Sequence, residues 1–545
     1  MIKKILAVIF GVMFMLTAHA GQIVNVDYIH RLIQQQWNII VPVNEQLPDT
    51  SVAANMEYLL TAIDVANKKL NGWPSSNYAS TEYATTAVAD TVAAQYAVEK
   101  LIKFIGFPFK LTTTKDTTEF QVTISAKGKF YINWGDGTEE VLDKQDTNET
   151  TYTHTYDTAG SYTFELDGKA TAYNNGSTTA AISFNNNSNV ASISGSLGQV
   201  FSTLANGTQP KFCYTFGNNT NLSGTIPPGL FSGIKGQPIK NMFYGTFYGA
   251  NKLSGQIPKG LFADITGNPT EGIYYRTFEN CSGLTGNIPG ALFAGLSGPP
   301  ARDMFHSTFS GCEGLTGSLP SELFSGINGA PAQRMYNATF SSCSGLSGNI
   351  PSKLFGVFDG QPQELMFGNT FYSCSGLTGH IPSDLFSGIH GTPVKRMFES
   401  TFNMCSGLTG SIPANLFADI DGTPAEKMFY NTFAGCSGLT GNVPSGLFAG
   451  IYGTVAPQMF YRTFFNCHNL TGIEDGVFGA LSGDAQSQMF AETFYRNYSL
   501  DGTSVKIGDK YLYEIWPNAT TAQVGKMYTD DTGLDDWASI PNTWK

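Results

Sequence analysis

Residues 370–386 have the sequence TFYSCSGLTGHIPSDLF, and close copies of this stretch recur along the chain. The copies are spaced by 31 residues and place phenylalanine at one repeat position: Phe216, Phe247, Phe278, Phe309, Phe340, Phe371, Phe402, Phe433, Phe464 and, after a one-residue deletion, Phe494. A fixed period of this length indicates that each copy is one supersecondary unit, which buries its apolar face only against its neighbours. The sequence therefore predicts a solenoid over more than half of the chain, with an extended binding surface rather than an enzyme pocket.

One repeat, residues 422–451, predicts one short strand and two short helical segments. Thr423 and Pro424 suit a helix start, and the apolar residues after them recur at intervals of three and four. The brief stretch 439–443 suits a strand, and Pro444 after it can begin the second helical segment. Stacked coils would pair these strands in parallel, about 4.8 Å apart, and bury columns of phenylalanine, leucine, methionine and cysteine. The fold class is therefore α/β.

The first 110 residues divide into two parts. Lys3 and Lys4, the apolar run 5–16 and small residues up to Ala20 have the three parts of a secretory signal peptide, residues 1–20. The apolar run is short for a membrane anchor, and the mature chain shows no transmembrane segment. Apolar spacing with glycine and proline stops predicts a helical region over 21–110. We interpret this region as a spacer or packing cap rather than as a catalytic or partner-binding part.

From residue 111 to 168 the pattern changes to strands. Phe120, Val122 and Ile124 alternate with polar residues, residues 130–138 suit a strand that enters a tight turn, and residues 154–164 suit a turn followed by a strand. Asp136 is expected to cap backbone N–H groups of the tight turn. His154 is expected to begin a strand, and we favour these structural roles for both residues over catalysis or metal binding.

Two resemblances follow from these motifs. Trp-Gly-Asp-Gly-Thr at 134–138, with His-Thr-Tyr and Gly-x-Tyr-Thr at 154–163, resembles the PKD domain, a small immunoglobulin-like β-sandwich. Its final strand is short here and ends at Asp167 and Gly168. The repeats resemble the leucine-rich repeats of BspA-like surface proteins, with the pattern Ala-Phe-x-x-Cys-x-x-Leu-x-x-Ile-x-Ile-Pro, although the units are longer here. Leu-Thr-Gly-x-Ile-Pro also resembles plant-type leucine-rich repeats. The BspA-like resemblance implies extracellular adhesion or recognition.

The predicted solenoid covers residues 169–500. It begins with a degenerate coil near Phe184, and residues 501–545 leave the repeat register and are expected to form a C-terminal cap. Seven of the eight cysteines share one repeat position: Cys281, Cys312, Cys343, Cys374, Cys405, Cys436 and Cys467. Parallel side chains in a ladder suit disulfide geometry badly. We therefore expect buried free thiols rather than disulfides, and no zinc site, because a linear ladder lacks convergent ligands.

Composition narrows the function further. The formal net charge is −12 and charged residues are 14% of the chain, so nucleic-acid binding is not expected. The histidines are scattered, and no nucleophile elbow, phosphate loop or calcium loop accompanies them. We predict no catalytic residues, no cofactor and no metal.

Repeat positions that vary while the rest stays fixed are the candidates for contact with a partner. One column lies inside the predicted strand: Gln256, Asn287, Ser318, Asn349, His380, Ser411 and Asn442. Its polar side chains, beside a column of serine and threonine, suit hydrogen bonds to glycans or protein backbone. The second column, on the predicted helical side, supplies tyrosines as interface anchors: Tyr244, Tyr275, Tyr430 and Tyr461. The alternative is that both columns are solvated surface.

The leading hypothesis is a non-enzymatic protein of the cell surface, the extracellular space or the periplasm, which binds an extracellular protein or a glycan. The alternative is a structural spacer or a self-assembling surface component. The sequence does not name the partner.

Overall fold

A computed structural model describes residues 109–529 and 533–545. The predicted signal peptide and almost all of the predicted helical region 21–110 lie outside the described residues. The last two residues of that region, Phe109 and Lys110, are not helical but begin the first strand, β1. In the part of the chain that is described, no helix has the length and apolar character needed to cross a membrane.

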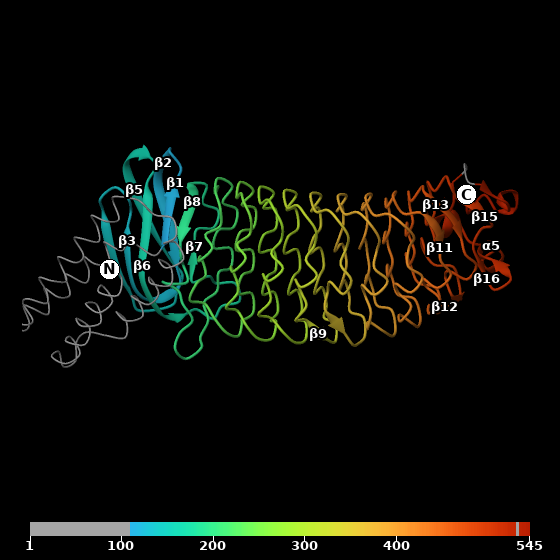
Figure 1. Ribbon diagram of the computed structural model, residues 1–545, viewed down its shortest axis with the longest axis horizontal. Helices are drawn as coiled ribbons and strands as arrows, with labels where there is room; N and C mark the ends of the chain where they lie inside the picture. The colour runs from blue at the N-terminus through green and yellow to red at the C-terminus, as the bar shows by residue number, and fades with distance from the viewer. Residues whose placement is uncertain (1–108, 530–532) are drawn as a thin grey trace, which may run out of the picture. The chain divides into compact units, whose positions relative to one another are not determined.

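Two antiparallel sheets form a small domain over residues 109–195 (Figure 1). Its strands are β1 (Phe109–Thr113), β2 (Thr117–Ile124), β3 (Ala126–Asn133), β4 (Glu139–Lys144), β5 (Thr150–Gly160), β6 (Thr163–Tyr173), β7 (Ile182–Ser183) and β8 (Val190–Gly195). One sheet has the order β4-β3-β6-β1-β8 and the other β5-β2-β7. Phe120, Val122 and Ile124 of β2 are buried, which confirms the predicted alternation.

The prediction for residues 154–164 was wrong in part. His154 lies inside β5 rather than at a strand start, and the turn comes later, between Gly160 and Thr163. Strand β6 also continues through Gly168, where the sequence suggested an end. Gly168 has a φ of +123° and lies so close to the carbonyl of Lys129 that a Cβ would come within 2.3 Å of its oxygen. The glycine therefore allows two strands to approach closely. In the sequence, a glycine with this role looks the same as a glycine that marks a turn.

Beyond this domain the repeats form coils that stack in register (Figure 1). The anchor phenylalanines are fully buried, and the rings of successive coils stack with centroids 5.2–5.8 Å apart. Parallel bridges such as Gly286↔Leu315 join neighbouring coils at the predicted strand. Where these bridges lengthen they become the strands β11 (Gly441–Val443) and β13 (Leu470–Ile473). A second series of parallel bridges, such as Gly298↔Ile327, lies further along each coil and lengthens into β9 (Asn328–Gly329), β10 (Val357–Phe358), β12 (Tyr452–Thr454) and β14 (Ala480–Ser482). The predicted strand and its parallel pairing are confirmed.

The two predicted helical segments of each coil do not form. The N–H of Thr246 bonds to the carbonyl of Phe243, three residues back in its own coil. The N–H of the next residue, Phe247, bonds instead to Thr277 in the following coil. Every fourth residue of this stretch has a positive φ: Asn241, Gly245 and Gly249. Alternating bonds and left-handed corners exclude the continuous i→i−4 ladder of an α-helix. The segments are chains of tight turns, and this part of the α/β prediction was wrong.

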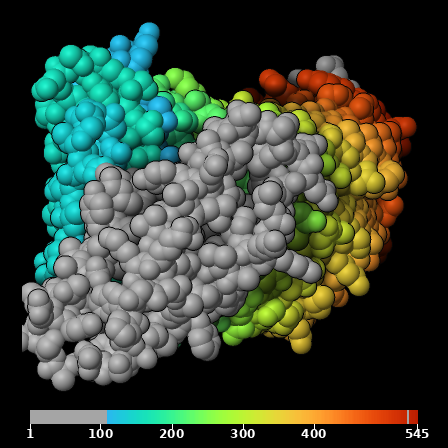
Figure 2. All heavy atoms as spheres, turned by 60° about the vertical axis from the view of Figure 1, so that its left-hand side comes forward, coloured from blue at the N-terminus to red at the C-terminus, as the bar shows by residue number. Residues whose placement is uncertain are grey.

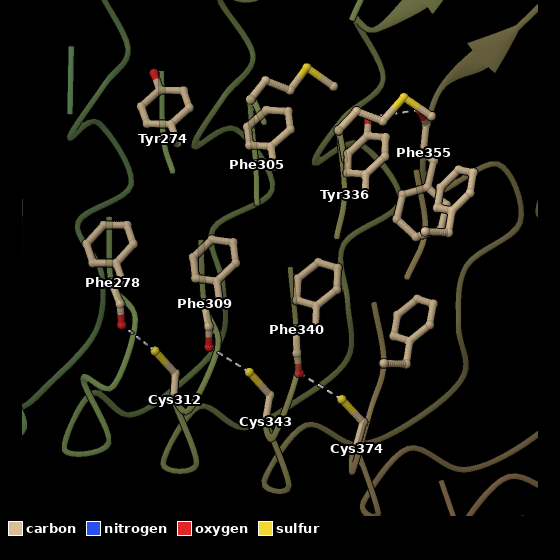
Figure 3. Packing of buried hydrophobic residues seen from close by; sticks show 14 of the residues in the cluster. Tyr274, Phe278, Phe305, Phe309, Cys312, Tyr336, Phe340, Cys343, Phe355 and Cys374 are labelled. Carbon is tan, nitrogen blue, oxygen red and sulfur yellow. Dashed lines mark hydrogen bonds between the residues drawn. The ribbon is translucent and has the colours of Figure 1, made fainter. Parts of the chain in front are cut away.

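Buried thiols and hydroxyls bond across the coils. Figure 3 shows Sγ of Cys312, Cys343 and Cys374 directed at the carbonyls of Phe278, Phe309 and Phe340, at 2.9–3.0 Å. The seven cysteines of the ladder are free and buried, as predicted, and Cys213 is free and buried as well. Burial raises the pKa of Cys374 to about 12. A threonine column before the phenylalanines bonds in the same way; Thr339 Oγ1 donates to the carbonyl of Phe305 at 2.9 Å.

Each end of the stack is covered by other parts of the chain. Phe184 contacts Phe109 and Phe120 of the sheet domain and Phe216 of the coils, so domain and coils share one core. At the other end, Tyr528 stacks on Phe494 with centroids 5.9 Å apart. This C-terminal segment contains β15 (Asp501–Gly502), β16 (Lys506–Ile507), β17 (Lys510–Tyr511), α5 (Leu512–Ile515), α6 (Thr521–Val524), β18 (Gly533–Leu534) and η2 (Trp537–Ser539).

Candidate binding faces

The variable strand column forms one exposed face, here called the strand face. It consists of Gln256, Asn287, Ser318, Asn349, His380, Ser411 and Asn442, and each of these residues is exposed. The neighbouring serine and threonine column, for example Thr285 and Thr378, is exposed as well. Beneath the face, the leucines that follow each cysteine are fully buried. The structure therefore brings the predicted strand residues together on the surface, one from each successive coil.

The glycine of each Ser/Thr-Gly pair determines how these side chains lie. Gly317 has a φ of +77°, and a Cβ there would come within 2.0 Å of Oδ1 of Asn287 in the preceding coil. Gly379 has the same relation to Asn349, at 1.8 Å. The amide groups therefore lie flat over the glycines of the next coil, which a larger residue at those positions would prevent. The repeated glycine keeps the strand face low and regular.

The polar groups of the strand face are available to a partner. In residues 109–529 and 533–545, the side chains of Gln256, Asn287 and Asn349 form no hydrogen bond with another described residue. Asn442 is an exception, since Thr471 Oγ1 lies 3.2 Å from its Oδ1. Free amides can both donate to and accept from a glycan or a peptide backbone.

The tyrosine column is less accessible than the sequence suggested. Tyr244, Tyr275 and Tyr430 are half-buried, and Tyr461 is buried with 8% of its surface exposed. The rings stack along the column: Tyr244 lies 4.7 Å from Tyr275, and Tyr430 lies 5.0 Å from Tyr461. These residues lie on a series of tight turns, here called the turn face, and not on helices. They form two separate stacks, because Asn337, Gly368 and Glu399 occupy the column between them.

The first stack belongs to a cluster in which every guanidinium group pairs with a carboxylate. The guanidinium of Arg276 lies over the ring of Tyr275, and Arg276 pairs with Glu279 at 2.7 Å. In the next coils Arg334 donates to both carboxylate oxygens of Asp303, at 2.7 and 2.9 Å. Burial would raise the pKa of Asp303, but hydrogen bonds from His306 and Arg334 outweigh it and lower that pKa. Arg302 Nε also lies 3.2 Å from Asp303 Oδ2, so three guanidinium groups pair with the two carboxylates of this cluster.

The second stack continues into a chain of alternating cations and aromatic rings, here called the basic aromatic row. It runs Lys427, Tyr430, Tyr461, Arg462, Phe465, Arg496, Tyr495 and Lys526. Each cation lies 5.0–5.9 Å from the centroid of at least one ring. Within the described residues a single carboxylate, Glu492, forms an ion pair with the row, at 2.9 Å from Arg462.

The sequence comparison by column missed the cations of this row. Lys427, Arg462 and Arg496 stand at different repeat positions, each four residues further along its coil than the one before. They become neighbours because the row crosses the coils diagonally. A search for basic residues along such diagonals, rather than down single columns, would have found them.

Asp136 and His154 form a polar contact in the sheet domain. Asp136 Oδ1 accepts from the N–H and Oγ1 of Thr138 at 2.9 and 2.6 Å, so its predicted turn-capping role is confirmed. Its Oδ2 lies 2.7 Å from Nε2 of His154, whose ring stacks on Trp134. Burial would raise the pKa of Asp136, but hydrogen bonds from Thr138 and His154 lower it to about 2. The arrangement ties the β3–β4 turn to β5.

The coil surface carries hollows rather than deep pockets. The visible surface of the coils passes from green through yellow to red in residue order (Figure 2). One hollow, lined by Phe231 and Phe262 among others, has a volume of about 160 Å³. Small-molecule sites are usually about 300–1,000 Å³. In the described part of the chain, no group of three or more histidines, cysteines or carboxylates is placed to hold a metal ion.

Comparison with protein-family models gave no match, and neither did comparison with curated proteins.

Proposed function

We propose that this protein is an exported, non-enzymatic recognition protein that binds an extracellular protein or a glycan through a leucine-rich-repeat-like solenoid. In this proposal residues 1–20 are a signal peptide, the sheet domain is PKD-like, residues 169–500 are the solenoid and residues 501–545 cap it. The resemblance to BspA-like surface proteins supports the assignment, and so does the parallel stacking of the coils.

One observation carries the proposal. The strand face presents one exposed, polar and variable side chain from each successive coil, above a core that hardly changes. Packing does not dictate the identity of exposed side chains, so variation at these positions leaves the fold intact. Extended solenoid faces of this kind suit large partners, which contact many coils at once.

The test uses the full chain, because the sheet domain shares its core with the first coils. The purified protein is applied to a glycan array and to extracellular proteins, and the triple variant Asn287→Arg, Asn349→Arg, Asn442→Arg is compared with it. Three long charged side chains on the strand face should weaken binding about tenfold or more. The matched control is Ala294→Arg, Ser387→Arg, Ala449→Arg, which adds the same charge at exposed positions of another column.

Each outcome separates the hypotheses. Loss of binding in the strand-face variant alone supports recognition by this face. Equal binding by both variants rejects the strand face as the site. No ligand, together with filaments or sheets that grow with protein concentration, favours a structural or self-assembling role. Hydrolysis of any glycan or peptide on the panel overturns the non-enzymatic assignment.

A separate measurement tests the location. Cell fractionation, followed by N-terminal sequencing of the recovered protein, should place it outside the cytoplasm with Gly21 as its first residue. A cytoplasmic protein that retains residues 1–20 would contradict export.

A further inference from the structure

The basic aromatic row stands out because the chain as a whole is acidic, with a net charge of −12. Among the described residues, the row's four cations, Lys427, Arg462, Arg496 and Lys526, form one ion pair, that of Arg462 with Glu492, and Glu426 also interacts electrostatically with Lys427. Within the described residues, Lys427 and Arg496 form no ion pair at all. Their contacts are the rings of Tyr430, Phe465 and Tyr495. The row is a local excess of positive charge, and local charge is what a ligand senses, because the Debye length is about 8 Å at physiological salt.

The cluster around the first tyrosine stack shows that this excess is not required by the fold. That cluster has the same left-handed turn corners and the same pairing of arginine with tyrosine, but each of its guanidinium groups forms an ion pair: Arg276 with Glu279, and Arg302 and Arg334 with Asp303. The turn face therefore accommodates arginines whose charge is paired. The unpaired cations of the row need another explanation than packing.

The backbone at the row places its cations at turn corners. All four adopt left-handed conformations, with φ of 57°, 53°, 66° and 56° in chain order. Arg276 and Arg334 of the first cluster adopt the same conformation, so it belongs to the turns in general and does not distinguish the row.

The row matches a linear anionic polymer better than an isolated anion. Each cation lies one coil beyond the last, and neighbouring cations share a ring: Arg462 and Arg496 lie 5.0 and 5.7 Å from the centroid of Phe465. The cations therefore form a line that a polymer with a repeated anionic group can follow. Arg496 forms no ion pair with a described residue, so its planar fork of N–H donors suits a carboxylate or sulfate, whereas Arg462 donates to Glu492.

The rings argue against single-stranded nucleic acid. Binding of that kind needs open aromatic faces on which bases stack. Here the cations and the neighbouring rings cover those faces; Tyr461 lies between Tyr430 and Arg462 and is 8% exposed.

We propose that the basic aromatic row binds an acidic polysaccharide, one that carries a carboxylate or sulfate on each repeat. This inference rests on the proposed function, since it names a ligand class for a recognition protein, but it uses a different face from the strand face.

The test measures the affinity of the full chain for oligogalacturonate and for its methyl ester, which has the same sugar backbone without charge. We expect the acid form to bind, and the ester to bind about tenfold more weakly or not at all. The variant Arg462→Ala, Arg496→Ala should lose about tenfold or more for the acid form, because it removes two charged hydrogen-bond donors. The variant Arg462→Lys, Arg496→Lys keeps the charge and should retain part of the affinity. Thermal denaturation of each variant verifies that the coils remain folded.

The matched control is Arg276→Ala, Arg334→Ala, which removes two ion-paired guanidinium groups from the first cluster and should leave the affinity unchanged. Equal affinity of the acid form for the wild type and the Arg462→Ala, Arg496→Ala variant would overturn the proposal, as would equal binding of acid and ester. Tighter binding of an oligothymidylate than of the glycan would replace it with nucleic-acid binding. Loss of glycan binding in the strand-face triple variant alone would reject the row while leaving the proposed function intact.

Discussion

At the scale of single residues, the repeat owes much of its regularity to buried hydrogen bonds. The threonine before each anchor phenylalanine is fully buried. Thr339 Oγ1 lies 2.9 Å from two carbonyls, that of Phe305 in the preceding coil and that of Tyr336 in its own. Interpreted as sequence alone, this threonine seemed an ordinary part of the motif. The structure shows it joining neighbouring coils.

Thr339→Val tests this role, because valine has nearly the shape of threonine and lacks the hydroxyl. It leaves buried carbonyls without one donor, which costs about 1–3 kcal/mol. We expect the urea midpoint of unfolding to fall, with the slope of the transition unchanged. Thr339→Ser keeps the hydroxyl and loses a methyl group. The urea midpoint of Thr339→Ser should therefore fall less than that of Thr339→Val. A Thr339→Val variant as stable as the wild type would refute the role.

The cysteine ladder makes a second prediction at this scale. Burial raises the pKa of Cys213, Cys374 and Cys467 to about 12 in each case. Because the thiolate is the reactive form, the folded protein should resist alkylation at pH 8.5, whereas all eight cysteines should react in guanidinium chloride. Mass spectrometry after iodoacetamide treatment counts the modified residues. Rapid labelling of the folded chain would contradict burial of the ladder.

At the scale of elements, the contact between the Asp136 carboxylate and His154 holds the β3–β4 turn against β5. The pKa of Asp136 is lowered to about 2 from an ordinary value of 3.8. A lowered carboxyl pKa stabilises the folded state above the unfolded value, and this stabilisation is lost as the pH falls through 4 towards 2. Asp136→Asn should be less stable than the wild type at pH 6, and the difference should shrink below pH 4. Unfolding midpoints at both pH values check this, and a difference independent of pH would contradict it.

The elements also show what the sequence could and could not predict. The strand at Leu-Thr-Gly was predictable, because the residues on either side are fixed by packing and proline ends it. The helical segments were mispredicted because apolar residues at intervals of three and four are compatible both with a short helix and with a chain of tight turns. Chains of turns with i→i−3 bonds bury the same residues as a short helix, and only the left-handed corners at Asn241, Gly245 and Gly249 distinguish them.

The candidate sites also differ in how far the sequence could predict them. The strand column was found by its variation between repeats, which sequence expresses directly. Burial of Tyr461 depends on its stacking against Tyr430 in the preceding coil. The basic aromatic row depends on coils placing Arg462 and Arg496 side by side, a relation between residues that share no column.

At the scale of the described molecule, the sheet domain and the first coils share one core. Phe184 lies between them: its ring contacts Phe109, Phe120 and Phe164 of the two sheets and Phe216 of the coils, with centroids 5.7–6.1 Å apart. An open stack of coils would leave apolar rings in water at its first coil. The sheet domain therefore covers the first coil much as a terminal repeat covers the end of the stack in solenoid proteins.

Phe184→Ala tests this coupling. Removing a fully buried phenylalanine costs about 3–5 kcal/mol. In a stack where each coil contacts only its neighbours, the loss should stay near residue 184. We expect amide hydrogen exchange to accelerate about 100-fold or more both in the sheet domain and in the first coils, up to about residue 230. The coils near residue 460 should keep their protection.

Phe464→Ala is the matched control, since it removes an equally buried ring from the far end of the same column. Its effect should fall on the C-terminal coils and spare the sheet domain. If the sheet domain of the Phe184→Ala variant kept wild-type protection while the first coils lost theirs, the two would be independent domains. The pattern of exchange therefore decides whether the sheet domain is a separate module or the cap on which the first coils depend.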